Sequence, residues 1–169
     1  MNIRIYIIGL LLFCLSLSSF GQTKAQSTEK YVLVIHGGAG TIVREKMTAE
    51  LEEEYVKVLN EALIIGQQIL DTGGLAVYAV EAAVKHMEDS PLFNAGKGSV
   101  FNNDGKNEMD ACIMDGRDLS CGSVSGVRNL KNPIEGARLV KDSSECVFLY
   151  GDKAQDFCLS KGATYADSS

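Results

Sequence analysis

Apolar residues recur at helical spacing in two segments of the first half of the chain. Between positions 51 and 69 they follow the three- and four-residue steps of one helix face, and Thr48 just before them is a typical N-cap. Gly73 and Gly74 end this helix. A second, more apolar helix is predicted over 75–88, and its alanines suit close packing against a sheet.

Strand patterns lie before and after these helices. The run 31–35 is aliphatic and mostly β-branched, which predicts a buried strand that leads into the glycines after His36. Residues 99–101 and 107–114 predict a hairpin around the turn Asn103-Asp-Gly-Lys106. A third strand is predicted over 119–127, and its glycines predict that it is partly irregular.

The last part of the chain alternates helix, strand and helix. Asn132 and Pro133 suit the N-cap and the first position of a helix that continues through Val140. A strand is predicted over 147–150, and a helix over 152–161 ends at Gly162. The complete order lacks the strict strand–helix alternation of a doubly wound fold. It indicates an α+β fold in which helices are layered on an antiparallel sheet.

The first 21 residues have the pattern of a secretory signal peptide. Arg4 is followed by an almost wholly apolar run over 5–17, and small residues precede a plausible cleavage site after Gly21. Residues 22–30 are polar and are predicted to be a flexible lead-in. The remaining 31–169 form the predicted folded portion, and we expect the protein to be exported, to the periplasm or outside the cell.

Charge and cysteine content narrow the function classes further. Sixteen basic and 22 acidic side chains leave the chain acidic, with no Lys/Arg cluster that would indicate a nucleic-acid partner. No apolar run after the signal peptide reaches membrane-spanning length. The four cysteines beyond the signal peptide do not have the spacing of a zinc site. The sequence does not decide whether any of them form disulfides. We expect Cys112, which lies in an apolar run, to be a buried thiol. The four cysteines are Cys112, Cys121, Cys146 and Cys158.

Several common chemistries fail at the level of pattern. No GxGxxG follows a strand and no GxxxxGK[ST] occurs, which excludes the dinucleotide and P-loop patterns. An esterase needs a GxSxG elbow, but the nearest stretch has Val124 at its centre. Asp110 and Asp115 lie five residues apart along a predicted strand and face opposite sides, so no paired-carboxylate site is indicated.

Four motifs carry a resemblance to a known family. In order they are His36-Gly-Gly-Ala-Gly40, Pro91-Leu-Phe-Asn-Ala-Gly-Lys-Gly98, Met109-Asp-Ala-Cys-Ile-Met-Asp-Gly116 and Gly126-Val-Arg-Asn-Leu-Lys-Asn-Pro133. Together they resemble the N-terminal (α) portion of the plant-type asparaginases, also called isoaspartyl peptidases. The resemblance runs from about Tyr31 to the last residue.

The resemblance implies a fold and a mechanism. The fold is the αββα four-layer sandwich of the N-terminal nucleophile hydrolases, of which this chain would hold the incomplete α half. In that family a precursor cleaves itself before a threonine, whose hydroxyl becomes the nucleophile and whose own α-amino group is the base. The implied substrates are L-asparagine and β-aspartyl dipeptides, and the implied assembly is (αβ)2.

The resemblance also assigns residues. Asn94 matches the asparagine that approaches the catalytic threonine, and its amide can donate and accept hydrogen bonds. Gly37 and Gly38 match the glycine loop that lines the site. A structural sodium is implied at a loop of main-chain carbonyls, which suit a hard cation whatever the side chain. The loop positions are Met87, Glu88, Ser90, Phe93, Ala95 and Lys97.

The nucleophile itself is missing from this sequence. The family's threonine stands in a Gly-Thr-Val-Gly stretch, and none occurs here. The leading hypothesis is therefore the α-portion of an autoprocessing amidohydrolase, truncated before its threonine and inactive without a β-portion. The alternatives are a non-catalytic fragment or binding module of the same fold, and a glycosylasparaginase-like amidase. A half-sandwich is expected to expose sheet edges and one apolar face.

Overall fold

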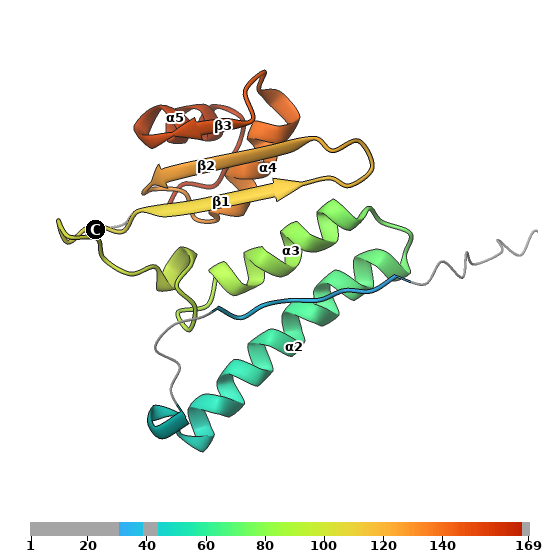
Figure 1. Ribbon diagram of the computed structural model, residues 1–169, viewed down its shortest axis with the longest axis vertical. Helices are drawn as coiled ribbons and strands as arrows, with labels where there is room; N and C mark the ends of the chain where they lie inside the picture. The colour runs from blue at the N-terminus through green and yellow to red at the C-terminus, as the bar shows by residue number, and fades with distance from the viewer. Residues whose placement is uncertain (1–30, 39–43, 167–169) are drawn as a thin grey trace, which may run out of the picture. The chain divides into compact units, whose positions relative to one another are not determined.

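The computed structural model describes residues 31–38 and 44–166. The predicted signal peptide, 1–21, and the lead-in, 22–30, lie outside the described residues. After a short 3-10 turn, η2 (Arg44–Lys46), come two long helices, α2 (Ala49–Asp71) and α3 (Ala76–Glu88), which lie side by side (Figure 1). Both predicted helices are confirmed to within about two residues.

Helix α2 begins where its cap predicts. Thr48 is extended, and its hydroxyl oxygen accepts a hydrogen bond from the Leu51 amide at 3.2 Å. Ala79 and Ala83 of α3 pack on α2, which corrects the expectation that the alanines of this helix face a sheet. A Cβ at Gly66 of α2 would lie 3.3 Å from the Ala79 carbonyl and 3.8 Å from the Ala83 Cβ. The small residues therefore bring two helices together.

The N-cap of α2 gives a direct test of local stabilisation. Thr48→Ala is expected to lower the free energy of unfolding by about 1 kcal/mol, because the Leu51 amide loses its acceptor. Urea unfolding followed by circular dichroism measures this change. Thr48→Ser keeps the hydroxyl and is the matched control. Equal losses in both variants would show that the methyl group, and not the cap, stabilises this end.

The three strands form one mixed sheet in the order β1-β2-β3. Strand β1 (Met109–Met114) pairs antiparallel with β2 (Cys121–Val127), as expected for consecutive strands of an antiparallel sheet. Strand β3 (Phe148–Tyr150) pairs parallel with β2, so the expectation of a purely antiparallel sheet is wrong. The cause is the crossover through α4 (Pro133–Ser143), which returns the chain to the starting end of β2.

Helices α4 and α5 (Gly151–Ser160) cover one face of this sheet (Figure 1). Val124, Val127 and Val140 lie in the core of this packing. The opposite face carries Met114, Phe148 and Tyr150, each more than half exposed. The described residues thus show a sheet with helices on one side. The other face is open to solvent among them, but it is mixed and not wholly apolar as expected, because Asp110, Ser123 and Ser125 lie on it as well.

The predicted strand over 31–35 is not formed. Residues 32–38 are in no strand of the described structure, and Val32 and Val34 are 87% and 79% exposed. Leu33 and Ile35 are half-buried, and a Cβ added at Gly66 would lie 2.6 Å from the Leu33 side chain. The alternating pattern does place alternate side chains on the exposed and half-buried sides of the segment. A β-strand also needs hydrogen bonds to a neighbouring strand, and no described strand pairs with residues 32–38. The 99–101 strand likewise shrinks to a single bridge, Phe101 to Asn107.

Two expectations about β1 and β2 need correction. Cys112 is exposed, because residues of β1 alternate and its neighbours Ala111 and Ile113 take the inner side. The buried thiol is instead Cys158 in α5, where burial raises the pKa to about 11. The irregularity of β2 lies at Gly126, with φ of 65°, opposite a register shift in β1. The four cysteines of the described residues form no disulfide.

Candidate functional site

Two motifs far apart in the sequence line one cavity. The glycine loop (Gly37, Gly38) and the loop that carries Asn94 share a cavity of about 630 Å³. The positive φ of Gly38, 113°, is a backbone conformation that glycine adopts without strain. The structure therefore brings together the residues that the resemblance assigned separately. The other lining residues are His36, Tyr55, Val84, Met87, Glu88, Pro91, Leu92, Phe93, Ala95, Gly98 and Val100.

An aromatic pair holds the two loops together. The Tyr55 hydroxyl of α2 donates a hydrogen bond to the Leu92 carbonyl at 2.8 Å. Its ring meets Phe93 edge to face, with centroids 5.6 Å apart. A Cβ at Gly37 would lie 3.5 Å from the Phe93 ring and 3.3 Å from Leu59. Helix α2 thus sets the position of both loops through contacts that no short motif reveals.

Asn94 uses only half of its amide within the loop. Its side-chain oxygen accepts a hydrogen bond from the Val100 amide at 2.9 Å. The side-chain nitrogen has no hydrogen-bond partner among the described residues. The side-chain nitrogen therefore leaves Asn94 free to donate at this cavity, while its oxygen is already engaged in one hydrogen bond within the loop.

The predicted ion loop has very close backbone packing. Gly96 has a φ of 52°, and a Cβ there would lie 2.3 Å from the Glu88 carbonyl oxygen. A Cβ at Gly98 would lie 2.2 Å from the Phe93 carbonyl oxygen. Only glycine permits such close contacts. The carbonyl groups of Glu88 and Phe93, two of the predicted ion ligands, therefore pack directly against the backbone of Gly96 and Gly98.

The carbonyl groups of this loop fit a hard monovalent cation. Three of the six predicted ligands each accept one backbone hydrogen bond: Met87 from Ser90, Phe93 from Ala95, and Ala95 from Gly98. The carbonyls of the other three accept none from described residues, which leaves oxygen lone pairs for an ion. These three are Glu88, Ser90 and Lys97. The described residues contain no cluster of three His, Cys, Asp or Glu side chains suited to a metal.

The Glu88 side chain is a feature that the sequence analysis missed. It is 3% exposed, and its Oε1 accepts a hydrogen bond from the Ile134 amide at 3.0 Å, at the start of α4. Its Oε2 is buried without a partner in the described structure. Burial raises the pKa of this carboxyl to about 7. The only sequence signal was an acidic residue at the end of an apolar helix.

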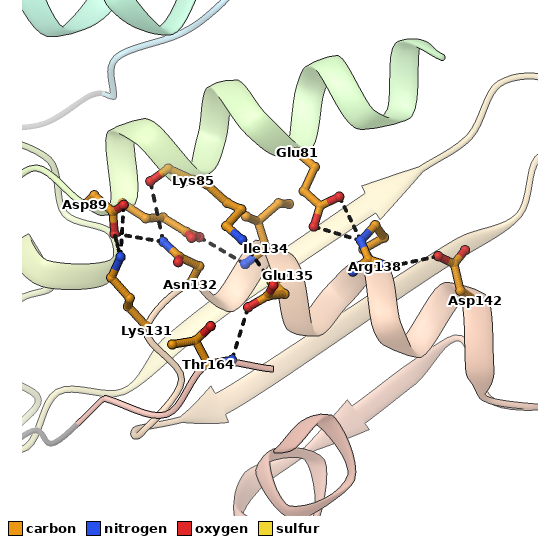
Figure 2. Close-up of polar contacts among 11 residues, drawn as sticks. Glu81, Lys85, Asp89, Lys131, Asn132, Ile134, Glu135, Arg138, Asp142 and Thr164 are labelled. Atoms are coloured by element: carbon orange, nitrogen blue, oxygen red, sulfur yellow. Dashed lines mark hydrogen bonds and ion pairs between the residues drawn. The ribbon is translucent and has the colours of Figure 1, made fainter. Parts of the chain in front are cut away.

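Asn132 occupies the predicted N-cap position of α4 but does not cap the helix with its side chain. Its amide nitrogen instead donates to Asp89 at 3.2 Å and to the Lys85 carbonyl at 3.4 Å (Figure 2). Lys131 pairs with Asp89 at 2.9 Å. Glu88 therefore caps α4 from another helix, while Asn132 ties the end of α3 to the start of α4.

Further ion pairs join the same two helices along their length. Figure 2 shows Lys85 of α3 beside Glu135 of α4, with a nitrogen–oxygen distance of 3.1 Å. One turn back along α3, Glu81 accepts from Arg138 at 2.7 Å. Interactions with the lysine and with the Thr164 amide lower the pKa of Glu135 despite its burial. A polar network thus joins α3 to α4 beside the predicted ion loop.

Among the described helices, none is long and apolar enough to cross a membrane.

Known proteins are similar in sequence to this chain over most of its length. A family model described as asparaginase matches residues 29–169. The isoaspartyl peptidase of Salmonella typhimurium is 44% identical over 133 residues, which are 79% of this chain and 42% of that protein. The isoaspartyl peptidase of Escherichia coli K12 is also 44% identical over 133 residues, 79% of this chain and 41% of that protein.

A mammalian protein shows the same partial coverage. The isoaspartyl peptidase/L-asparaginase of Rattus norvegicus is 46% identical over 151 residues, which are 86% of this chain and 44% of that protein. The chain therefore spans about two fifths of the length of these curated relatives. Its match lies in their N-terminal part.

Proposed function

Because the chain belongs to the asparaginase family, we propose that it is the α-portion of an amidohydrolase that acts on L-asparagine and β-aspartyl peptides. The observation that carries the proposal is the shared cavity of Gly37, Gly38 and Asn94. The cavity needs a nucleophile from outside the chain, because no threonine here stands in the family's context. The proposed partner is a β-portion that supplies this threonine and the second half of an αββα sandwich.

Each residue of this chain has a limited part in that reaction. Asn94 donates a hydrogen bond through its side-chain nitrogen and so orients the oxygen of the incoming nucleophile or substrate. Gly37 and Gly38 let the backbone pass close to the reacting centre, because no side chain fills that space. A sodium bound by the loop carbonyls supplies rigidity and no chemical step. These residues position groups, and the covalent chemistry belongs to the threonine.

The open sheet face supports the proposed partner. Met114, Phe148 and Tyr150 expose apolar surface on the side away from α4 and α5. The segment 32–38 exposes Val32 and Val34, and its first residues alternate between exposed and half-buried as in a strand. A second sheet would bury both surfaces. Export to the periplasm or beyond, and (αβ)2 assembly, complete the proposal.

A chimeric enzyme tests this function. Residues 31–169 of this chain are joined to the part of the Escherichia coli isoaspartyl peptidase that lies beyond the match. We expect the chain alone to release no ammonia from L-asparagine. We expect the chimera to cleave itself into two fragments and then to release ammonia from L-asparagine or aspartate from a β-aspartyl dipeptide.

Asn94 variants of the chimera test the assigned donor. Asn94→Ala is expected to lower kcat roughly tenfold, because a positioned hydrogen-bond donor is lost. Asn94→Asp keeps the acceptor for the Val100 amide but removes the donating nitrogen, and it should be equally impaired. An Asp variant as active as the parent would show that Asn94 only stabilises its loop.

The outcomes separate the competing functions. A chimera that folds and cleaves itself but hydrolyses neither substrate would contradict the asparaginase assignment and favour the non-catalytic or binding-module alternative. Release of aspartate from glycosylasparagine alone would favour the glycosylasparaginase-like amidase. Activity on L-asparagine by the chain alone would contradict the need for a β-portion.

A further inference from the structure

The second oxygen of Glu88 is the least satisfied polar atom of the described structure. Oε1 caps α4 through the Ile134 amide, whereas Oε2 is buried and has no partner. A buried carboxylate oxygen without a partner is costly. Neither nearby lysine forms an ion pair with it, because Lys85 is paired with Glu135 and Lys131 with Asp89.

Glu88 lines a small second cavity between the ion loop and the start of α4. This cavity has a volume of about 160 Å³. No Lys, Arg or His of the described residues lines it, although three carboxylate residues do. Glu108 is paired with Arg128 at 3.0 Å, and Asp110 accepts from the Ser125 hydroxyl at 2.6 Å. The lining residues are Glu88, Asn94, Ala95, Gly96, Ser99, Glu108, Met109, Asp110 and Pro133.

We propose that the side-chain carboxylate of Glu88 is the fixed counter-charge of one small monovalent cation bound at the loop over 87–98. The inference rests on the proposed function and deepens its ion loop, in which Glu88 was assigned only a main-chain carbonyl. The carboxylate supplies one negative charge, and neutral carbonyl oxygens of the loop supply the remaining ligands. Sodium is the cation that we commit to.

Charge and geometry favour a monovalent ion over a divalent one. Calcium sites in proteins use several carboxylates, but the described residues contain no group of three acidic, His or Cys side chains that could hold a metal. Glu108 and Asp110 are already engaged with Arg128 and Ser125. A single available carboxylate with neutral oxygens matches a single positive charge.

The proposal also couples the ion to helix α4. Because the same carboxylate accepts from the Ile134 amide, a cation on Oε2 holds Glu88 in the position that caps α4. Cation binding therefore stabilises the contact between α3, the loop and α4. A cation held only by main-chain carbonyls would not depend on the Glu88 side chain.

Thermal unfolding of the full chain tests the proposal. Tm is measured in sodium chloride and in choline chloride at equal ionic strength and mildly alkaline pH. We expect sodium to raise Tm by about 4 °C at a concentration roughly tenfold above its Kd. Glu88→Gln keeps an oxygen that can cap α4 but removes the charge, and it should lose this rise. Glu108→Gln removes an acidic side chain from the same cavity wall and should keep it.

The same variants are measured in the chimera, so that a poorly folding chain leaves the test intact. A sodium effect that survives in Glu88→Gln would overturn the proposal, because main-chain carbonyls alone would then hold the ion. If Glu108→Gln also lost the rise in Tm with sodium, the proposal for Glu88 would be overturned. Sodium would then be attracted by the acidic surface in general and not bound at one carboxylate. No sodium effect in the parent would refute the ion site but leave the amidohydrolase proposal to the ammonia assay.

Discussion

Gly122→Ala is expected to destabilise the fold strongly. A Cβ at Gly122 in β2 would lie 2.3 Å from the Ala137 carbonyl oxygen and 2.3 Å from the Lys141 amide nitrogen of α4. Both contacts are with helix backbone, which cannot move aside as a flexible side chain can. The strand and the helix would have to separate, at a cost of about 3 kcal/mol.

Gly116 provides the matched control for this substitution. It lies in the turn between β1 and β2, its φ is not positive, and a Cβ there would meet nothing within 4 Å. Gly116→Ala should change the free energy of unfolding by no more than about 0.5 kcal/mol. Urea unfolding of both variants measures the difference. Similar stabilities would show that α4 does not pack on β2 as closely as described.

The stability of the chain is expected to fall as the pH rises from about 4.5 to about 7. Burial raises the pKa of Glu88 from 4.5 to about 7, so in this window the folded state binds a proton that the unfolded state has released. The stabilising contribution is fully present below pH 4.5 and is lost as the pH rises through 7. Its size is ~3 kcal/mol.

The groups around Glu88 act on its pKa in both directions. Burial is the largest effect. The hydrogen bond from the Ile134 amide, the nearby Asn132 side chain and the charge of Lys85 lower the pKa of Glu88, whereas Asp89 raises it further. The other carboxyls with shifted pKa are all lowered, so their contributions are lost below the pH window of Glu88. Asp115 is the extreme case, because hydrogen bonds from Arg117 lower its pKa to about 2.

Glu88→Gln should remove this pH dependence. The measurement is urea unfolding at several pH values in choline buffer, which keeps sodium out. The parent should lose stability between pH 4.5 and 7 while Glu88→Gln stays nearly flat. The pKa of Glu108 is lowered in the parent, so Glu108→Gln should lose stability between pH 4.5 and 7 as steeply as the parent does. A flat parent profile would mean that Glu88 is ionised throughout in the folded state.

Local patterns determined most of the helices. The cap at Thr48, the stops at Gly73 and Gly162, and the pair Asn132-Pro133 each depend on a few neighbouring residues, and each boundary lies close to its predicted place. The hairpin turn also followed from local chemistry, because the side chain of Asn102 accepts from the amides of Asp104 and Lys106. Such signals are local and therefore readable in one sequence.

Contacts between distant segments could not be predicted in this way. The direction of β3 depends on the crossover through α4, and the exposure of Cys112 depends on which side of β1 faces the helices. Glu88 caps a helix that begins far later in the chain, as the hydrogen bond from the Ile134 amide, 46 positions away, shows. No pattern within a window of residues encodes such a pairing.

The sequence by itself determined the helices, the turns, the excluded chemistries and, through four ordered motifs, the family. Only the tertiary structure decided that Gly37, Gly38 and Asn94 share one cavity, that Asn94 is left as a donor, and that a buried Glu88 links the ion loop to α4. The physical reason is the distance along the chain over which each interaction acts. Propensities, caps and turns act over a few residues, whereas burial and the partners of a buried polar group depend on which distant segments the fold brings together.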